Sequence, residues 1–242
     1  MALNIGSSMN AYRNYQNSVK SVSGSTQRLS TGSQINSAAD NAAGLAISEK
    51  MRTQITADKA ALQNTQMGVN AAQTADGALS SVQDALGRMR ELASQASNGV
   101  YTDADRGALQ QEFSQLQSQI GSVFEGTNFN GNTLLGSAPD SGGLSIATQD
   151  GAQSAMDGLA AAIDAVSSQR ADFGAQQNGL EHTAASLGNA AINAQEAESE
   201  IRDADIAAQV MENTKNKILN QMNIAMMAQA NQNAAGVLKL LQ

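Results

Sequence analysis

The side chains best suited to catalysis or metal binding are few in this sequence. It contains one His, His182, and no Cys, so it cannot form a Cys–His pair, a helix bearing two zinc-binding His residues or a thiolate metal site. His182 lies within a predicted long helix and has no nucleophile beside it, which favours an ordinary surface or seam His over a general base. We therefore expect no catalytic residue, no metal ligand and no cofactor.

Two further patterns match binding motifs only in part. Asp203 and Asp205 could supply two ligands of a cation site, but no acidic partner follows them, which favours a solvated helix face. The glycine-rich residues 136–143 lack the Lys and Ser/Thr of a phosphate-binding loop and predict a turn region. The sequence thus favours a structural protein over an enzyme.

The composition indicates long helices that pack side by side. The 242 residues are 41% hydrophobic but only 3% aromatic, which suits narrow seams of aliphatic side chains better than a compact enzyme core. Pro139 is the one proline, so nothing prevents long helices on either side of it. No apolar run reaches the roughly 18 residues of a membrane-spanning helix.

Apolar residues recur at helical spacing over three segments. Steps of three, four and seven predict a helix over about 51–97, a shorter stripe predicts a helix over about 102–126, and a second long stripe predicts one over about 150–201. Because the two long stripes can fold back and bury each other, we predict a mainly α fold, an elongated antiparallel long-helix bundle or coiled coil. The expected bundle core comprises Leu79, Leu86, Phe113, Leu116, Ile163, Phe173, Leu180 and Leu187.

Residues 126–151 differ from the helical segments. Six glycines and Pro139 surround two short apolar runs, Thr133-Leu134-Leu135 and Leu144-Ser145-Ile146-Ala147. These features predict one small β-hairpin at about 126–151.

The two ends of the chain carry apolar stripes with too little to pack on, so each alone would be marginal in water. The N-terminal stripe is interrupted at Gly24, and the cations at both ends form no dense patch, so neither nucleic acid nor a membrane is an expected partner. We predict a terminal helical domain of residues 1–42 plus 203–242 and a long-helix bundle domain of residues 43–202. The residues expected to mediate self-assembly are Leu3, Ile5, Met9, Val19, Val22, Ile218, Met222, Met226, Leu238 and Leu241.

Several segments resemble one known family. RLSTGSQINSAADNAAGLAI at residues 28–47 closely resembles the N-terminal signature of bacterial flagellins, and RADFGA at 170–175, QNGLEHT at 177–183, IRDAD at 201–205 and VLKLL at 237–241 resemble further flagellin motifs in family order. The resemblance implies a secreted subunit that polymerises into the extracellular bacterial flagellar filament for motility. It also implies that the terminal domain forms the inner filament core, that variable outer domains are missing, and that an export chaperone and cap or hook-associated proteins are partners.

Two alternatives remain beside the filament subunit. A hook–filament junction protein, which is a hook-associated protein, would share the same architecture. A membrane-active amphipathic helical protein is the alternative from a different class, suggested by the basic ends.

The resemblance also implies binding to Toll-like receptor 5 of a host. The family motif for that receptor matches this sequence around Arg88, Leu92 and Glu112, which are the predicted contacts. Arg88 and Leu92 are four residues apart and would project from one helix face.

Overall fold

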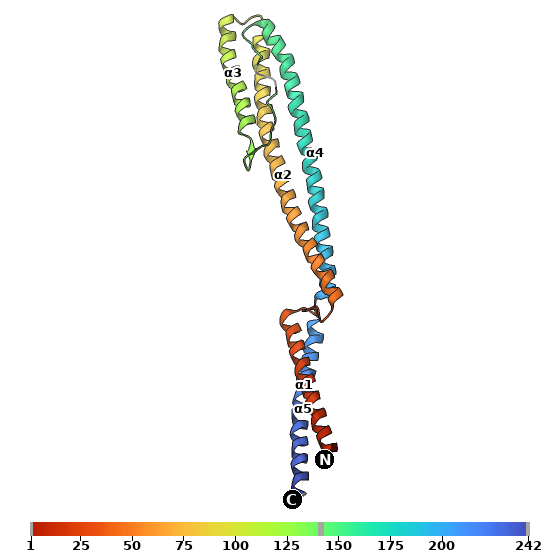
Figure 1. Cartoon of the computed structure of the whole chain (residues 1–242). Helices are drawn as coiled ribbons and strands as arrows, with labels where there is room; N and C mark the ends of the chain where they lie inside the picture. Colours follow the sequence, from red (N-terminus) through yellow and green to blue (C-terminus); the bar gives the residue numbers. More distant parts are fainter. Residues whose placement is uncertain (1, 140–142, 241–242) are drawn as a thin grey trace. The chain divides into compact units, whose positions relative to one another are not determined.

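The computed structural model describes residues 2–139 and 143–240 (Figure 1). Within them the chain is mainly helical and contains a single pair of short strands, which confirms the predicted mainly α fold class with one small β-hairpin. The elements are α1 (Ala2–Thr31), α2 (Ala42–Ala96), α3 (Asp103–Gly126), β1 (Asn128–Phe129), β2 (Asn132–Thr133), α4 (Gln149–Arg202) and α5 (Ile206–Leu240). None of the described helices has an apolar stretch long enough to cross a membrane.

The chain forms two compact units. The terminal unit comprises Met1–Ala57 and Ala190–Gln242, and the central unit comprises Asp58–Asn189. The helices α2 and α4 each contribute to both units, so the boundaries of the units lie inside these helices rather than at the predicted positions near residues 42 and 203.

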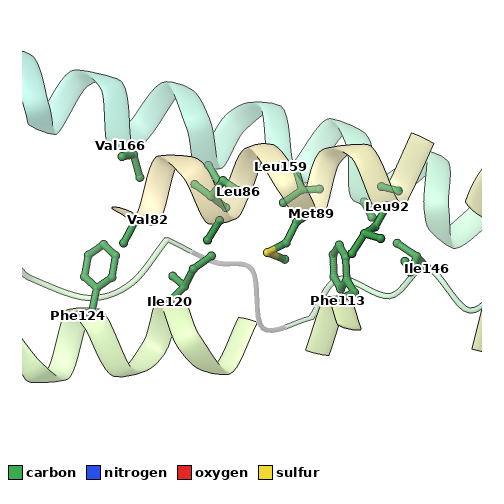
Figure 2. Close-up of a cluster of buried hydrophobic side chains, with 14 of the residues drawn as sticks. Val82, Leu86, Met89, Leu92, Phe113, Ile120, Phe124, Ile146, Leu159 and Val166 are labelled. Carbon is green, nitrogen blue, oxygen red and sulfur yellow. The ribbon is translucent and has the colours of Figure 1, made fainter. Parts of the chain in front are cut away.

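The core of the central unit lies between α2, α3 and α4. Val82, Leu86 and Met89 recur on α2 at helical spacing and are almost completely buried. Figure 2 shows these side chains meeting Leu159 of α4 and Ile120 of α3, among other buried side chains. Burying aliphatic and aromatic side chains in this way contributes roughly 1.5–3 kcal/mol for each large one.

Within the central unit, α2 and α4 run antiparallel. Leu180 of α4 packs against Gly68 of α2, where an added Cβ would lie 3.2 Å from the Leu180 Cδ1 atom. Further along, the Arg170 Nε atom donates to Asp76 Oδ1 at 2.8 Å. As the residue number falls along α4, it rises along the facing side of α2, which is the antiparallel pairing expected of the two long stripes.

The hairpin is shorter than the sequence predicted, and Thr133 alone of the two predicted apolar runs lies in a strand. β1 and β2 pair antiparallel, and the two residues between them, Asn130 and Gly131, both have positive φ angles of 52° and 81°. This turn geometry favours Asn-Gly because both central residues must be left-handed. The predicted apolar run Leu144–Ala147 forms no strand.

The reason is that the Leu144–Ala147 segment packs directly on helices. Ile146 is fully buried in the core of the central unit, and its N–H donates to the Gln110 side chain of α3 at 2.6 Å. An added Cβ at Gly158 of α4 would lie 2.7 Å from Leu144. A side-chain acceptor therefore satisfies this backbone where a neighbouring strand would otherwise be needed.

Two helix ends also differ from the prediction. α1 continues through Gly24 to Thr31, and α2 begins at Ala42, about nine residues before the predicted start. At the beginning of α2 the Asn41 side chain accepts a hydrogen bond from the Gly44 N–H at 2.9 Å. An Asn cap of this kind begins a helix without any apolar periodicity.

Candidate functional site: the paired terminal helices

The helices α1 and α5 pair side by side in the terminal unit (Figure 1). Their facing positions recur at alternating steps of three and four, as in a coiled coil. Most of these positions carry small or polar side chains instead of large apolar ones. The seam comprises Ala11, Tyr15, Ser18, Val22 and Ser25 of α1 and Gln209, Asn213, Asn216, Asn220 and Asn223 of α5, all buried or half-buried.

Hydrogen bonds cross this seam at several levels. The Asn213 Nδ2 group donates to Ser25 Oγ at 3.0 Å and to Thr26 Oγ1 at 2.9 Å. Two helical turns further along, Asn220 Nδ2 donates to Ser18 Oγ at 3.2 Å. Each such bond contributes only about 0.5–1.5 kcal/mol net. The pair is thus held in register mainly by polar contacts and has little apolar burial of its own.

Most of the large apolar side chains of α1 and α5 lie on the outside. Those with well-exposed side chains are Met9, Tyr12, Val19, Ile206, Val210, Met211, Ile218, Leu219, Met222, Ile224 and Met226, at 42–68% exposure. An exposed apolar surface of this extent is typical of a protein–protein contact. We call these residues the apolar surface of the terminal helices. Most side chains in the seam are therefore small or polar while most large apolar side chains face outward, the reverse of a helix pair that is stable alone.

Five of the ten self-assembly residues predicted from sequence lie on this apolar surface. Met9, Val19, Ile218, Met222 and Met226 are exposed there. Val22 instead lies half-buried in the seam between α1 and α5. The side chains of Leu3, Ile5 and Leu238 and the whole of Leu241 lie outside the described residues.

The hydrophobic periodicity could not identify the seam itself. A search for apolar spacing passes over Gln209, Asn213 and Asn216, although these three are more than nine-tenths buried. The sequence pattern that does indicate the seam is the repeat of amide side chains at steps of four and three along the end of the chain.

The predicted bundle-core residues lie in the central unit at different depths. Leu79, Leu86 and Phe113 are fully buried. Leu116, Ile163 and Phe173 are partly buried and pack against that cluster. Leu180 and Leu187 are half-buried further along α4.

The predicted receptor contacts do not share one surface. Leu92 is fully buried in the core of the central unit, close to Phe113 and Ile146 in Figure 2, so its assignment as an exposed contact is wrong. The apolar face of α2 is wider than one heptad stripe because α3 and α4 both pack on it. Arg88 and Glu112 are exposed and form an ion pair of 2.9 Å between α2 and α3.

Two ion pairs link helices of the central unit. Arg88 also pairs with Glu91, and its hydrogen bonds to Glu91 and Glu112 raise the pKa of the guanidinium. Between α4 and α2, the hydrogen bond to Asp76 raises the pKa of Arg170. Both are partly exposed, so each pair contributes only modestly to stability.

The segment 28–47, which resembles the flagellin signature, forms the turn between α1 and α2. Gly32 at the end of α1 has φ +68° and its C=O accepts from the Ala204 N–H at 2.9 Å. Asp40 accepts hydrogen bonds from the hydroxyl and the N–H of Ser37 and from the Asn36 N–H. These bonds lower the pKa of the Asp40 carboxyl, and Arg28 lies 3.5 Å from it. The signature thus builds a compact turn that positions α1.

The candidate side chains for catalysis or cation binding, His182, Asp203 and Asp205, lie in surroundings that are typical of structural residues. His182 is exposed on α4. Asp205 accepts hydrogen bonds from the Ala207 and Ala208 N–H groups and so caps the beginning of α5. Asp203 accepts from the Ser199 hydroxyl. Among the described residues no three His, Asp or Glu side chains are grouped as metal ligands.

Comparison with known proteins gives a consistent set of similarities. The bacterial flagellin N-terminal helical region matches residues 3–139, and the bacterial flagellin C-terminal helical region matches residues 156–241. The chain is 42% identical to a flagellin of Halalkalibacterium halodurans, with 97% of each protein covered. It is 38% identical to the flagellar filament 30.7 kDa core protein of Treponema maltophilum, over 91% of this chain and 92% of that protein. The crystal structure of Bacillus cereus flagellin is 30% identical, with a TM-score of 0.48, and covers 53% of this chain and 88% of that one.

Proposed function

The chain belongs to the bacterial flagellin family, and we propose that α1 and α5 carry the main contacts through which its copies polymerise. It is a structural subunit of the extracellular flagellar filament and not an enzyme. Relatives that match nearly its whole length are named flagellins or filament core proteins, which favours the filament subunit over a hook–filament junction protein or a membrane-active protein.

The observation that supports this assignment is the reversed polarity of the terminal helix pair. Asn and Ser side chains fill the seam, while Met, Ile, Leu and Val side chains face outward. Burial of apolar surface stabilises a protein by about 25 cal/mol for each Å². Because these apolar side chains are still exposed in the single subunit, most of the stabilisation that their burial could supply has not yet been gained. Contact with the same helices of neighbouring copies would recover it.

A charge on the apolar surface tests the proposal. We expect Met222→Asp to reduce the rate at which filament seeds elongate by at least about tenfold, because assembly would bury an unpaired charge. Because Met222 is exposed in the single subunit, the thermal unfolding of the monomer should change little. Elongation is measured by light scattering and electron microscopy.

Ser137→Asp is the matched control, since it places the same charge in the exposed segment after the hairpin. It should leave elongation close to that of the unaltered chain. Normal elongation by Met222→Asp would show that the surface around α5 does not carry the contacts.

We further propose that the apolar surface has partners before and after assembly. The resemblance to flagellins implies a flagellar export chaperone, which would cover the exposed side chains of α5 in the unassembled subunit. Cap and hook-associated proteins would meet the same surface at the ends of the filament. The support for both proposals is the exposure of residues such as Ile218 and Met226.

We also propose that the monomer binds Toll-like receptor 5 through Arg88 and Glu112, without Leu92. The two side chains are exposed and bridged by their ion pair, so they present one surface made by α2 and α3. A contact of this kind between subunits in the filament would hide it, which is why the monomer is the expected ligand.

Arg88→Ala should weaken binding of the monomer to the receptor ectodomain by about 1–2 kcal/mol, because it removes an arginine anchor and releases Glu112. Surface plasmon resonance measures the effect. Arg52→Ala, which removes an exposed arginine paired with Glu49 elsewhere on α2, is the control and should bind normally. Equal affinities for the two variants, or no binding by the unaltered monomer, would contradict the proposal.

A further inference from the structure

Methionines are concentrated on one side of α5. Met211, Met222 and Met226 are 68%, 56% and 63% exposed, and Ile218 is exposed between them. Their spacing of seven, four and four residues places all four on one stripe of the helix. The three sulfur atoms are therefore presented together along roughly 22 Å of helix, at 1.5 Å per residue.

This stripe faces away from the partner helix α1. The residues of α5 that contact α1, such as Asn213 and Asn220, lie on the opposite side of the helix. Met227 belongs to that side and is only half-exposed. In the single subunit nothing in the described residues covers the thioethers of the stripe, whereas Met89 in the core of the central unit is fully buried.

We propose that Met211, Met222 and Met226 form a reversible oxidation site that controls whether the subunit can assemble. The inference rests on the proposed function, because it requires that copies of the chain cover this stripe. The oxidant is a two-electron oxidant such as hydrogen peroxide. A sulfur lone pair attacks one peroxide oxygen, the S–O bond forms as the O–O bond breaks, and water leaves, so the thioether becomes a sulfoxide.

The chemical change acts directly on the contact surface. A thioether is apolar and adapts its shape to several partners, whereas a sulfoxide is polar and chiral. Assembly would remove the water molecules that are hydrogen-bonded to three sulfoxides on one stripe. A neighbouring subunit offers no matching hydrogen-bond donors in their place, which disfavours association. Subunits already in the filament keep the stripe covered, so oxidation modifies the stripe of unassembled subunits alone and prevents only these from assembling.

The first experiment maps the oxidation. Monomer and preformed filament of the full chain are treated with equal doses of hydrogen peroxide and digested, and mass spectrometry reports the sulfoxide fraction at each methionine. We expect Met211, Met222 and Met226 to oxidise at least about tenfold faster in the monomer than in the filament, since exposure controls the reaction. Met89 should stay reduced in both. Equal rates in monomer and filament would overturn the proposal.

The second experiment measures assembly. Elongation of untreated seeds by oxidised monomer should fall at least about tenfold and recover after treatment with methionine sulfoxide reductases. A variant with Leu at all three positions cannot be oxidised there, so the ratio of its elongation rates with and without peroxide treatment should stay near one, whatever its untreated rate. Met67→Leu, which removes an exposed methionine of the central unit, is the control and should remain peroxide-sensitive.

The outcomes separate this inference from the proposed function. Normal elongation by oxidised monomer overturns the oxidation site but leaves the filament function intact. Equal peroxide sensitivity of the Leu variant and the unaltered chain also overturns it. If the Leu variant does not elongate even untreated, recovery of the unaltered chain by the reductases still decides the question: recovery supports the site, and no recovery overturns it. Failure of untreated, unaltered monomer to elongate would instead count against the proposed function.

Discussion

Deleting residues 1–30 should abolish polymerisation while the central unit stays folded, because the deletion removes nearly all of α1 and leaves α5 without its partner. The seam residues of α5, including Asn213 and Asn216, would then be exposed, and the helix would be marginal alone. The buried core of the central unit draws only on residues between Ala75 and Phe173, so it loses none of its side chains. Deleting residues 215–242 should have the same two effects through loss of most of α5.

Electron microscopy after addition of filament seeds measures polymerisation, and circular dichroism with thermal melting measures folding. We expect no filaments from either truncated chain and a retained cooperative transition from the central unit. Ser137→Asp serves as the assembly-competent control. Filaments of normal diameter from either truncation would falsify the assignment of assembly to the terminal helices.

The second large effect is expected in the core of the central unit. Leu159→Asp should lower the free energy of unfolding by roughly 4 kcal/mol or more, since it removes a buried side chain and places a carboxylate among apolar ones. Leu159 is fully buried and lies beside Met89 and Leu86 (Figure 2). Urea unfolding followed by circular dichroism measures the change.

Ala161→Asp is the matched control two residues further along α4. Ala161 is exposed, so the same new side chain should cost only about 0.7 kcal/mol or less, through its lower helix propensity. Similar losses of stability in the two variants would contradict the assignment of Leu159 to the core.

Much of the helical architecture could be predicted because its physical cause is local. The stripes that include Leu79 and Leu86 on α2 and Ile163 on α4 repeat at the helical period, and one proline leaves the long helices unbroken. The beginning of α3 was also predictable, because Thr102 and Asp105 form a capping box within four consecutive residues.

The errors arose where the surroundings of a residue lie far away in the sequence. Leu92 is predicted from sequence as a receptor contact on the same helix face as Arg88, but the packing of α2, α3 and the segment around Ile146 buries it. The run at Leu144 has the composition of a strand, yet Gln110 of α3 and Gly158 of α4 give it a different set of contacts. Neither neighbour is visible in the local pattern.

By itself, the sequence determined the flagellin family, the helices and the apolar residues available for assembly. Periodicity and signature motifs are properties of neighbouring residues, so no tertiary contact is needed to read them. Only the tertiary structure decided which side of each terminal helix faces its partner. Asn213 and Ser25 lie 188 positions apart, and the hydrogen bond between them turns the polar side of α5 inward and the methionine stripe outward. A polar seam has no hydrophobic periodicity, so its existence follows from paired donors and acceptors that only the folded chain brings together.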